Sequence, residues 1–269
     1  MESQKKRSAA KKDYIYNIEK EGAAQLILFG FPNVGKSSIV SALTNADCEI
    51  ADYPFTTQKP LPGMIKFEDI QFQILDTPAY TDESNETGLF YMVRNGDLII
   101  LVVDLSDEPA LQLEMIFDEM SKRGIAMLGR EEGEKADHLK KRVLIVGNKC
   151  DINGSNLANE EVKSKYGIRF PILAISAEAR INLKEFKREI YQASGIVRVY
   201  TKIPGKDPDT DNPFILRKGS TVLSLAEHVH KDFLSKLKFA RIWGSEKYNG
   251  QKVKRDYQLK DGDIIEIHI

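Results

Sequence analysis

GFPNVGKSS, residues 30–38, is the stretch that decides the fold of this chain. It follows an apolar run at 25–29 and opens a segment with helical periodicity at 37–45. A turn with the pattern G-x-x-x-x-G-K-[ST] between a strand and a helix directs successive backbone N–H groups at phosphate oxygens. We therefore predict a phosphate-binding loop here. An ordinary glycine-rich turn is the less favoured alternative.

Each residue type in the loop has a physical reason. Glycine at positions 30 and 35 lets the backbone curl around the phosphates. Lys36 supplies a positive charge to the outer phosphates, and the hydroxyl of Ser37 can ligate Mg²⁺. The positive end of the following helix dipole adds to the attraction. The residues of this loop predicted to bind the nucleotide are Gly30, Asn33, Val34, Gly35, Lys36, Ser37 and Ser38.

The sequence NKCD, residues 148–151, predicts which base the nucleotide carries. It follows the apolar run at 143–147, at the end of a predicted buried strand. The carboxylate of Asp151 can accept two hydrogen bonds from the N1–H and 2-amino groups of guanine. Adenine offers neither donor and would leave the carboxylate desolvated and unpaired. We therefore predict guanine nucleotides, GTP and GDP.

The neighbours of Asp151 complete the predicted base site. Asn148 is expected to tie this loop to the phosphate loop, and the stem of Lys149 to cover one face of the base. The next predicted strand ends at Ser176 and Ala177, and we expect a backbone N–H there to reach the O6 atom of guanine.

A magnesium ion is expected beside the phosphates, with Ser37, Thr57 and Asp76 as the predicted ligands. Asp76 ends the apolar run at 70–75, and a carboxylate at a strand tip across from a phosphate loop holds Mg²⁺, usually through water. Between them lies YPFTT, residues 53–57, whose threonine hydroxyls could complete the metal shell. We favour Thr57 over Thr56 as the ligand; a plain loop is the alternative.

Apolar runs alternate with helical patterns up to about residue 195, the order typical of an α/β fold with a mostly parallel sheet covered by helices on both faces. The predicted strands are 25–29, 70–75, 98–104, 143–147 and 171–175. The predicted helices are 37–45, 87–94, 109–122, 158–166 and 183–193. The charged, glycine-containing stretch 124–140 indicates an exposed insertion.

The alternation of apolar runs and helical patterns ends near residue 195. Beyond it we predict a strand at 196–201, a Pro- and Asp-rich loop at 204–213, a strand start at 214–217, a helix at 222–236 and closing strands at 264–269. The predicted domains are a basic, flexible segment at 1–23, a nucleotide-binding domain at 24–195 and a small α+β domain at 196–269.

Composition bounds the class of protein. The chain has 269 residues, of which 42% are hydrophobic, and no apolar run is long enough to cross a membrane. No signal peptide is recognisable and the two cysteines form no disulfide framework, so we expect a cytoplasmic protein. The net charge is −1, but residues 196–269 hold 14 Lys and Arg against 10 Asp and Glu, which favours an anionic partner.

Basic and aromatic side chains of residues 196–269 could form a face on which RNA bases stack. The candidates are Arg198, Lys202, Arg217, Lys218, Lys231, Lys238, Arg241, Lys252, Lys254 and Arg255, with Tyr200, Trp243 and Tyr248. For any single residue, a buried tryptophan or an ordinary solvated lysine is the better interpretation.

The segments GFPNVGKSS, YPFTT, DTP, NKCD and SA stand in the order found in Obg-related GTPases of the TRAFAC class, which the chain resembles. RVYTKIPGKDPDTDNPFILRKGSTVLSLAEHVHKDF, FARIWGSEKYNGQKV and LKDGDIIEIHI resemble the TGS domain of the developmentally regulated GTP-binding (DRG) proteins. Together these resemblances cover residues 24–269. They imply a P-loop G domain followed by a β-grasp TGS domain, and a role around ribosomes or RNA.

Three departures from the family pattern affect the expected chemistry. The family's DxxG is DTPA here, so Ala79 replaces the glycine whose N–H meets the γ-phosphate, and it can donate only at φ values that an L-residue tolerates. Tyr80 stands where Ras-like enzymes carry a water-orienting glutamine, a role that a phenol cannot take. The chain is also too short for both the N-terminal helical region and the G-domain insertion of DRG proteins, so we expect a trimmed relative.

Hydrolysis without that glutamine needs another source of positive charge. In related GTPases an asparagine at the position of Asn33 helps hold K⁺ between the phosphates; that Asn33 merely suits the turn is an equal alternative. We expect Lys36, Asn33 and Thr57 to act in a slow GTPase reaction. The rival hypothesis is a docking adaptor that senses GTP and GDP and barely hydrolyses GTP.

Overall fold

The computed structural model describes residues 16–44, 60–81, 86–129, 140–246 and 248–269. The chain divides into two compact units. The first unit comprises Met1–Phe67 and Gln71–Ser194, and the second comprises Glu68–Ile70 and Gly195–Ile269. The first unit carries the four loops that the sequence assigns to the nucleotide.

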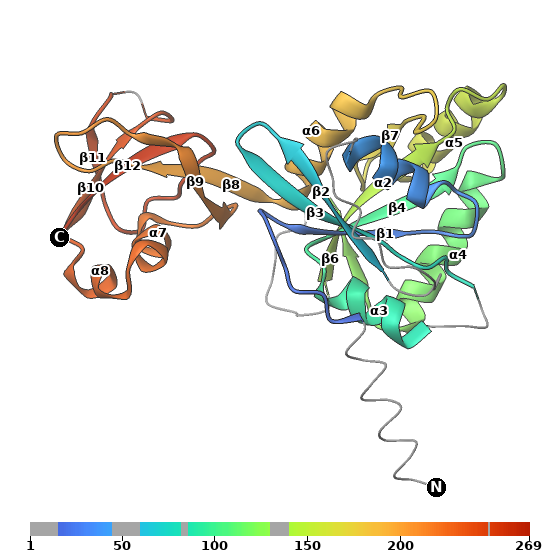
Figure 1. Cartoon of the computed structure of the whole chain (residues 1–269), viewed down its shortest axis with the longest axis horizontal. Helices are drawn as coiled ribbons and strands as arrows, with labels where there is room; N and C mark the ends of the chain where they lie inside the picture. Colours follow the sequence, from blue (N-terminus) through green and yellow to red (C-terminus); the bar gives the residue numbers. More distant parts are fainter. Residues whose placement is uncertain (1–15, 45–59, 82–85, 130–139, 247) are drawn as a thin grey trace, which may run out of the picture. The chain divides into compact units, whose positions relative to one another are not determined.

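The first unit contains, within its described residues, a seven-stranded sheet in the order β2-β3-β1-β4-β6-β5, with β7 also paired to β6 (Figure 1). The strands are β1 (Gln25–Phe29), β2 (Leu61–Phe67), β3 (Ile70–Asp76), β4 (Leu98–Asp104), β5 (Ala126–Leu128), β6 (Lys140–Asn148) and β7 (Ile172–Ala174). β1 runs parallel to β3 and β4, and β6 runs parallel to β4, β5 and β7. The carboxyl ends of these strands therefore meet at one edge of the sheet.

Helices lie on both faces of this sheet (Figure 1). They are α2 (Lys36–Thr44), α3 (Glu86–Asn95), α4 (Pro109–Lys122), α5 (Ser155–Tyr166) and α6 (Leu183–Ser194). Successive strand residues point to opposite faces, and Ile99, Leu101 and Val103 of β4 join the buried cluster formed by α3 and α4. The intervening residues of β4 are equally buried, which explains the continuous apolar run. No helix in the described ranges combines the length and the apolar character needed to cross a bilayer.

The second unit has a five-stranded sheet in the order β11-β10-β12-β8-β9 among its described residues. Its elements are β8 (Ile196–Thr201), β9 (Asp209–Arg217), α7 (Val222–Val229), α8 (Lys231–Lys236), β10 (Phe239–Trp243), β11 (Gln251–Val253) and β12 (Asp263–His268). Leu225 of α7 packs with strand residues such as Val199, Ala240 and Ile265 in a separate core. The hydroxyl of Thr221 accepts a hydrogen bond from the N–H of Ser224 and so caps α7.

The predicted α/β class is confirmed, but two elements of the first unit differ from the sequence-based prediction. β2 was not predicted, because Pro62 and Gly63 interrupt its apolar pattern. The stretch 124–140 was predicted as an exposed insertion, yet it begins with β5, in which Met127 and Leu128 are buried. Residues 130–139 lie outside the described part of the chain.

Two elements of the second unit also differ from the prediction. β9 begins at Asp209, inside the predicted loop at 204–213. The predicted helix at 222–236 is two helices, because the backbone at His230 is extended, with φ −165° and ψ 136°. The imidazole of His230 accepts the N–H of Asp232 and so starts the second helix, a local arrangement that helical periodicity does not reveal.

Candidate nucleotide-binding site

Four loops gather at the carboxyl edge of the first unit's sheet. They follow β1, β3, β6 and β7, which are parallel strands or neighbours of a shared strand. Each of these loops carries residues that the sequence assigns to the nucleotide. Such an edge, where crossover connections leave a crevice, is where open α/β sheets bind ligands.

The turn between β1 and α2 has the backbone that a phosphate-binding loop needs. Gly35 has a φ of 92° and Asn33 a φ of 63°, in the left-handed region that glycine and asparagine tolerate best. A β-carbon at Gly30 would lie 2.3 Å from the carbonyl oxygen of Val102, so this position admits only glycine. α2 begins at Lys36, and its first N–H groups therefore face the turn.

The Lys36 ammonium is enclosed by the turn. Its Nζ atom donates hydrogen bonds to the carbonyl oxygens of Gly30 at 3.0 Å and Phe31 at 2.9 Å, and only 7% of the residue is exposed. Burial lowers the pKa of Lys36 to about 8, although the negative charge of Asp76 acts in the opposite direction. A cation that has lost its water is ready to pair with an anionic phosphate.

Asp76 stands at the end of β3, next to the turn. Burial raises the pKa of its carboxyl group, while a hydrogen bond from Ser37 and the charge of Lys36 act to lower that pKa. The two oxygen ligands predicted for Mg²⁺, one from Ser37 and one from Asp76, therefore lie near each other. Hard oxygen donors of this kind are those that Mg²⁺ prefers.

Asn148 joins three of the four loops through one side-chain amide. Its Nδ2 atom donates to the carbonyl oxygen of Val34 at 2.9 Å, and its Oδ1 atom accepts the N–H of Ala177 at 3.1 Å. Asn148 is 3% exposed, so both hydrogen bonds are shielded from water. The predicted link between the base loop and the phosphate loop is thus present in the structure.

The base loop leaves the carboxylate of Asp151 exposed, at the position predicted for the guanine edge. Two hydrogen bonds hold the loop in place. The N–H of Cys150 donates to the carbonyl oxygen of Ile175 at 3.0 Å, and the hydroxyl of Ser155 donates to the carbonyl oxygen of Cys150 at 2.8 Å. These contacts fix the backbone at Cys150, immediately before Asp151.

The N–H groups assigned to the guanine O6 atom are engaged within the protein. Ala177 donates to Asn148, as described above, and Ser176 donates to the carbonyl oxygen of Ile181 at 3.3 Å. The hydroxyl of Ser176 accepts the N–H of Ala179 at 2.9 Å. The loop after β7 is thus folded into a tight turn, and contact with O6 would require one of these donors to change partner.

Sequence reasoning missed one acidic residue beside the base loop. The ammonium of Lys149 forms an ion pair with the carboxylate of Asp104, which ends β4. The sequence carried a usable signal, since Asp104 ends the apolar run at 98–104 just as Asp76 ends the run at 70–75.

Comparison with known proteins decides the family. Residues 25–149 match the family model of the 50S ribosome-binding GTPases, and residues 197–269 match that of the TGS domain. An uncharacterized GTP-binding protein of Methanocaldococcus jannaschii is 31% identical over 94% of this chain and 80% of its own length. Developmentally-regulated G-protein 1 of Arabidopsis thaliana is 26% identical over 94% of this chain and 78% of its own length. The chain belongs to this family of GTP-binding proteins, which includes the DRG proteins.

The fold of this family member has a counterpart among solved structures. A GTP-binding protein from Pyrococcus horikoshii OT3 superposes with a TM-score of 0.60 at 17% identity, over 91% of this chain and 99% of the other. At that identity the likeness shows the fold alone. The predicted P-loop G domain with a TGS domain, and the resemblance to the DRG family, are thus confirmed.

In this GTP-binding protein two of the residues that follow Asp76, Thr77 and Tyr80, are buried. Tyr80 is 6% exposed, and its ring stacks on Phe29 with centroids 5.6 Å apart, inside the hydrophobic core. Its backbone N–H donates to the carbonyl oxygen of Gly30 at 3.1 Å. Ala79 keeps a φ outside the left-handed region. The ring of Tyr80 thus has a packing role in this structure.

The remaining predicted residues are two threonines and two residues of the phosphate loop. Thr56 and Thr57 lie outside the described residues, so the predicted third metal ligand stays a prediction. Asn33 and Ser38 are exposed, at the mouth of the turn, where Asn33 is open to a ligand.

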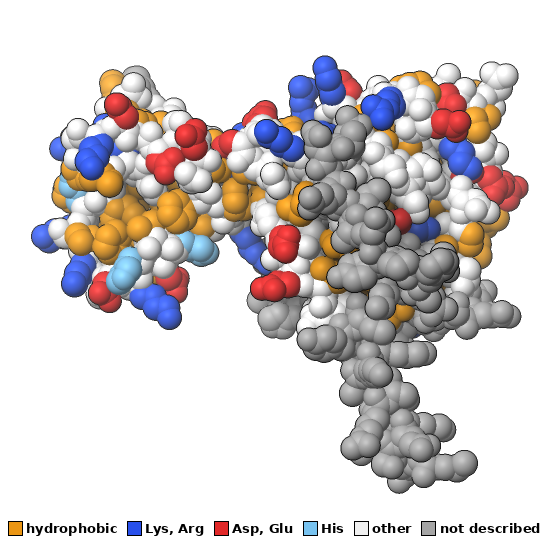
Figure 2. Space-filling view, viewed as in Figure 1, with side chains coloured by type: hydrophobic (Ala, Val, Ile, Leu, Met, Phe, Trp, Pro, Cys, Tyr) orange, Lys and Arg blue, Asp and Glu red, His pale blue; other side chains and the backbone are white. Residues whose placement is uncertain are grey.

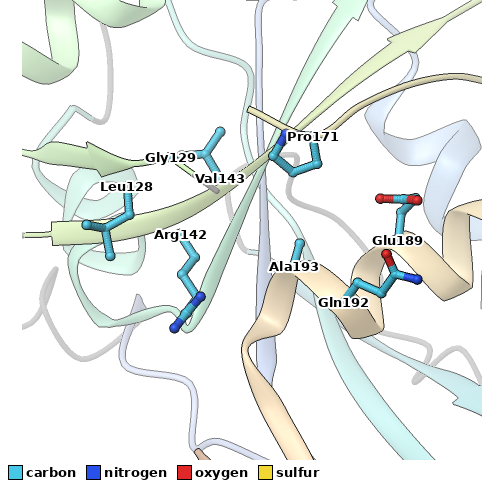
Figure 3. Close-up of a pocket in the computed structure, with 8 residues that line it drawn as sticks. All are labelled: Leu128, Gly129, Arg142, Val143, Pro171, Glu189, Gln192 and Ala193. Atoms are coloured by element: carbon cyan, nitrogen blue, oxygen red, sulfur yellow. The ribbon is translucent and has the colours of Figure 1, made fainter. Parts of the chain in front are cut away.

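A cavity of about 250 Å³ lies elsewhere in the first unit (Figure 3). It opens where β5 ends and β7 begins alongside β6, and α6 closes one side of it. Its lining residues are Leu128, Gly129, Arg142, Val143, Pro171, Glu189, Gln192 and Ala193. The β6 residues among them lie toward the opposite end of that strand from Asn148, so this cavity is not the nucleotide site.

Proposed function

We propose that this protein slowly hydrolyses GTP to GDP and phosphate in the cytoplasm, and that the reaction is coupled to binding of RNA or the ribosome. The observation that carries the proposal is the convergence of Lys36, Ser37 and Asp76 at one edge of the sheet. Asn148 joins the base loop to the same turn. The loops proposed to bind the phosphates and guanine are therefore linked to each other, as a GTPase requires.

The proposed roles follow from the chemistry of each group. Lys36 pairs with the outer phosphates, and Asp151 accepts the N1–H and 2-amino groups of guanine. Ser37 and Asp76 would hold Mg²⁺, because their oxygens fit its preference and lie near each other. When bound, Mg²⁺ supplies positive charge to the β- and γ-phosphates.

Asn33 is the proposed residue for K⁺. Its exposed side chain stands at the mouth of the turn, and its neutral amide oxygen is a suitable ligand for a monovalent cation. K⁺ held there would supply the positive charge that an arginine finger gives in other GTPases.

One observation favours the rival function, a GTP- and GDP-sensing adaptor with little hydrolysis. Tyr80 is packed in the core against Phe29 and Phe90, which favours a structural role for its ring over the orientation of a water molecule. A partner would then have to supply the missing catalytic contact.

Single-turnover phosphate release separates the two functions. The full-length protein is loaded with GTP in Mg²⁺ and K⁺ buffer, and phosphate is measured with and without ribosomes. Slow release by the protein alone supports the GTPase, and Lys36→Ala, which should not bind GTP, sets the background. Release at the background rate in both conditions, with GTP still bound to the wild-type protein, would leave only the adaptor.

Coupling to RNA is supported by one face of the second unit's sheet. Ala240 and Ile242 of β10 point into the core, so Phe239, Arg241 and Trp243 point to the opposite face. Across the strand pairings, Lys252 of β11 and His268 of β12 occupy the same face. We call these five residues, together with Lys202, the TGS outer face.

Cations and rings alternate on the TGS outer face. Lys252 Nζ lies 4.0 Å from the ring centroid of Phe239, and Lys202 Nζ lies 4.7 Å from that of Trp243. The rings of Phe239 and His268 stack with centroids 4.4 Å apart. In the described part of the chain, no carboxylate pairs with Lys202, Arg241 or Lys252. Glu266, opposite Arg241 in the strand pairing, lies on the same face and contacts His268 at 2.7 Å. Cations beside aromatic rings suit single-stranded RNA.

Two of the residues that the sequence suggests for RNA binding are already engaged in contacts within the second unit. Arg198, one of the predicted basic candidates, pairs with Asp261 at 2.9 Å, and Tyr200 donates its hydroxyl to Asp69 at 2.5 Å. These two residues are therefore occupied within the unit. Figure 2 shows one side of the second unit, on which hydrophobic side chains form a band bordered by His and by both basic and acidic side chains.

RNA binding is tested on the full-length protein with a fluorescent single-stranded oligonucleotide. The double variant Arg241→Gln, Lys252→Gln should bind about tenfold more weakly and with a smaller salt dependence, because two phosphate contacts are lost. Lys163→Gln, an exposed lysine of α5, is the matched control. Equal affinity of the double variant and the wild type would refute RNA binding by this face.

A further inference from the structure

The carboxylate of Asp104 lies beside the base loop and contacts two different segments. In the sheet Asp104 pairs with Asn148, so it stands directly next to the start of the base loop. Its Oδ1 atom accepts the N–H and the hydroxyl of Ser106 at 2.9 and 2.6 Å. Its Oδ2 atom accepts the ammonium of Lys149. The side chain of Asp104 is 10% exposed and that of Lys149 is 33% exposed, so the carboxylate is largely shielded from water and the lysine is partly open to it.

The partners of Asp104 keep it charged. Burial acts to raise the pKa of its carboxyl group, but the hydrogen bonds from Lys149 and Ser106 and the charge of Lys149 outweigh burial. The resulting pKa lies below the ordinary value, so the group is ionised at neutral pH. The contact with Lys149 is therefore a charge-assisted hydrogen bond, the strong kind.

Lys149 would be costly to order without this partner. Its backbone is in the left-handed region, with φ 65°, and a lysine side chain has more rotational freedom to lose than most others. With the backbone fixed by the loop and Nζ fixed by Asp104, the stem is held at both ends beside Asp151. A side chain ordered before the ligand arrives no longer adds its ordering entropy to the cost of binding.

We propose that Asp104 is a positioning residue for guanine nucleotides, which holds Lys149 so that its stem lies flat against the base. The inference rests on the proposed base site at Asp151. Because the contact is to the base, Asp104 contributes equally to the affinity for GDP and for GTP. It contributes only through Lys149, and this dependence can be measured.

A double-mutant cycle on the full-length protein tests the proposal. The four proteins are the wild type, Asp104→Asn, Lys149→Met and the double variant, and the readout is the dissociation rate of fluorescent GDP and of a non-hydrolysable GTP analogue. Methionine keeps an apolar stem without the ammonium. Asp104→Asn should accelerate dissociation of both nucleotides about tenfold, equivalent to about 1.4 kcal/mol. In the Lys149→Met background the same change should have no effect.

Further variants keep the test decisive. Ser106→Ala loosens the Asp104 carboxylate without removing it, and should accelerate dissociation about threefold in the wild-type background only. Glu114→Gln, which breaks the exposed ion pair with Lys165, is a control expected to leave dissociation unchanged. Urea unfolding of each variant checks that the fold is intact.

The outcomes distinguish this proposal from the proposed base site. Equal acceleration by Asp104→Asn with and without the Lys149 ammonium would overturn the positioning role, because Asp104 would then act on the fold. An effect confined to the GTP analogue would also overturn it, since the contact would be to the phosphates. Failure of the proposed base site would give a different result: the wild-type protein would bind adenine nucleotides as tightly as guanine nucleotides.

Discussion

A β-carbon on Gly35 would lie 2.2 Å from the Nδ2 atom of Asn148. The phosphate loop and the base loop therefore approach so closely that only a glycine fits between them. The same amide nitrogen donates to the carbonyl oxygen of Val34, so this approach lets one side chain fix both loops. The loop proposed to bind the phosphates and the loop proposed to bind the base are thus both held by the side chain of Asn148.

Gly35→Ala should weaken GDP binding tenfold or more, since the new methyl group displaces Asn148 and the φ of 92° strains any L-residue. Titration with fluorescent GDP measures the loss. Gly124→Ala is the matched control, because Gly124 also has a positive φ of 67° but has open space around it. A Gly35→Ala protein with normal affinity would mean that the loops can separate without loss of binding.

Asp151→Asn should lower guanine nucleotide affinity by about 2–4 kcal/mol, because an amide presents a donor where two donors of guanine arrive. The same amide matches xanthine, which offers one donor and one carbonyl oxygen at this edge, so XDP should gain affinity relative to GDP. Competition titrations with GDP and XDP measure both changes. Asp118→Asn, in an exposed ion pair of α4, controls for the loss of charge. Unchanged GDP affinity would remove Asp151 from the base site.

The parts predicted best from the sequence are those fixed by local chemistry. The phosphate loop requires residues that tolerate a left-handed backbone and a lysine within a few positions of them, so it can be recognised from residues 30–37 alone. β1 and β4 have the predicted bounds, because strands buried on both faces leave a continuous apolar run. Elements that lie between such apolar runs are harder to predict from the sequence. β2 carries Pro62 and Gly63 and is stabilised by its neighbour strand, not by its own pattern.

Contacts between distant segments were the least predictable. Asp104 and Lys149 are far apart in sequence and become partners only because β4 and β6 are adjacent in the sheet. The inward packing of Tyr80 depends in the same way on Phe29 and Phe90. Sheet order converts such residues into neighbours, and strand patterns alone do not specify that order.

Lys36→Met should abolish or nearly abolish GTP binding yet make the protein more stable at pH 7. The pKa of Lys36 is about 8 in the folded protein, against an ordinary value of 10.5 for a lysine. Below about pH 8 the folded state therefore bears the cost of a desolvated charge, on the order of 1–3 kcal/mol, which methionine removes. Urea unfolding at pH 7 measures this gain.

The pH dependence of the same pair gives an independent check. Between about pH 8 and 10.5 the unfolded wild-type chain binds more protons at Lys36 than the folded chain does. The unfolding free energy of the wild type should therefore rise with pH relative to that of Lys36→Met, and the difference between them should shrink. A constant difference over this range would mean that the Lys36 ammonium carries no desolvation cost.

The monovalent ion offers the most direct test of how hydrolysis proceeds. If Asn33 helps to seat K⁺, replacing K⁺ by Na⁺ at constant ionic strength should slow single-turnover phosphate release about tenfold or more, about 1.4 kcal/mol of barrier. Na⁺ is smaller, and oxygens fixed by the turn would hold it poorly. Nucleotide affinity should change far less, because the charge matters most as the transition state forms.

Asn33→Ala should then remove the difference between the two salts, because the amide oxygen that selects K⁺ is gone. The substitution also places alanine at a φ of 63°, so Asn33→Gly, which relieves that strain, is the control for the backbone. Both variants should release phosphate at the slow, Na⁺-like rate in either salt. Equal wild-type rates in K⁺ and Na⁺ would sink the K⁺ hypothesis and leave Asn33 with the role that its left-handed backbone already indicates, that of a turn residue.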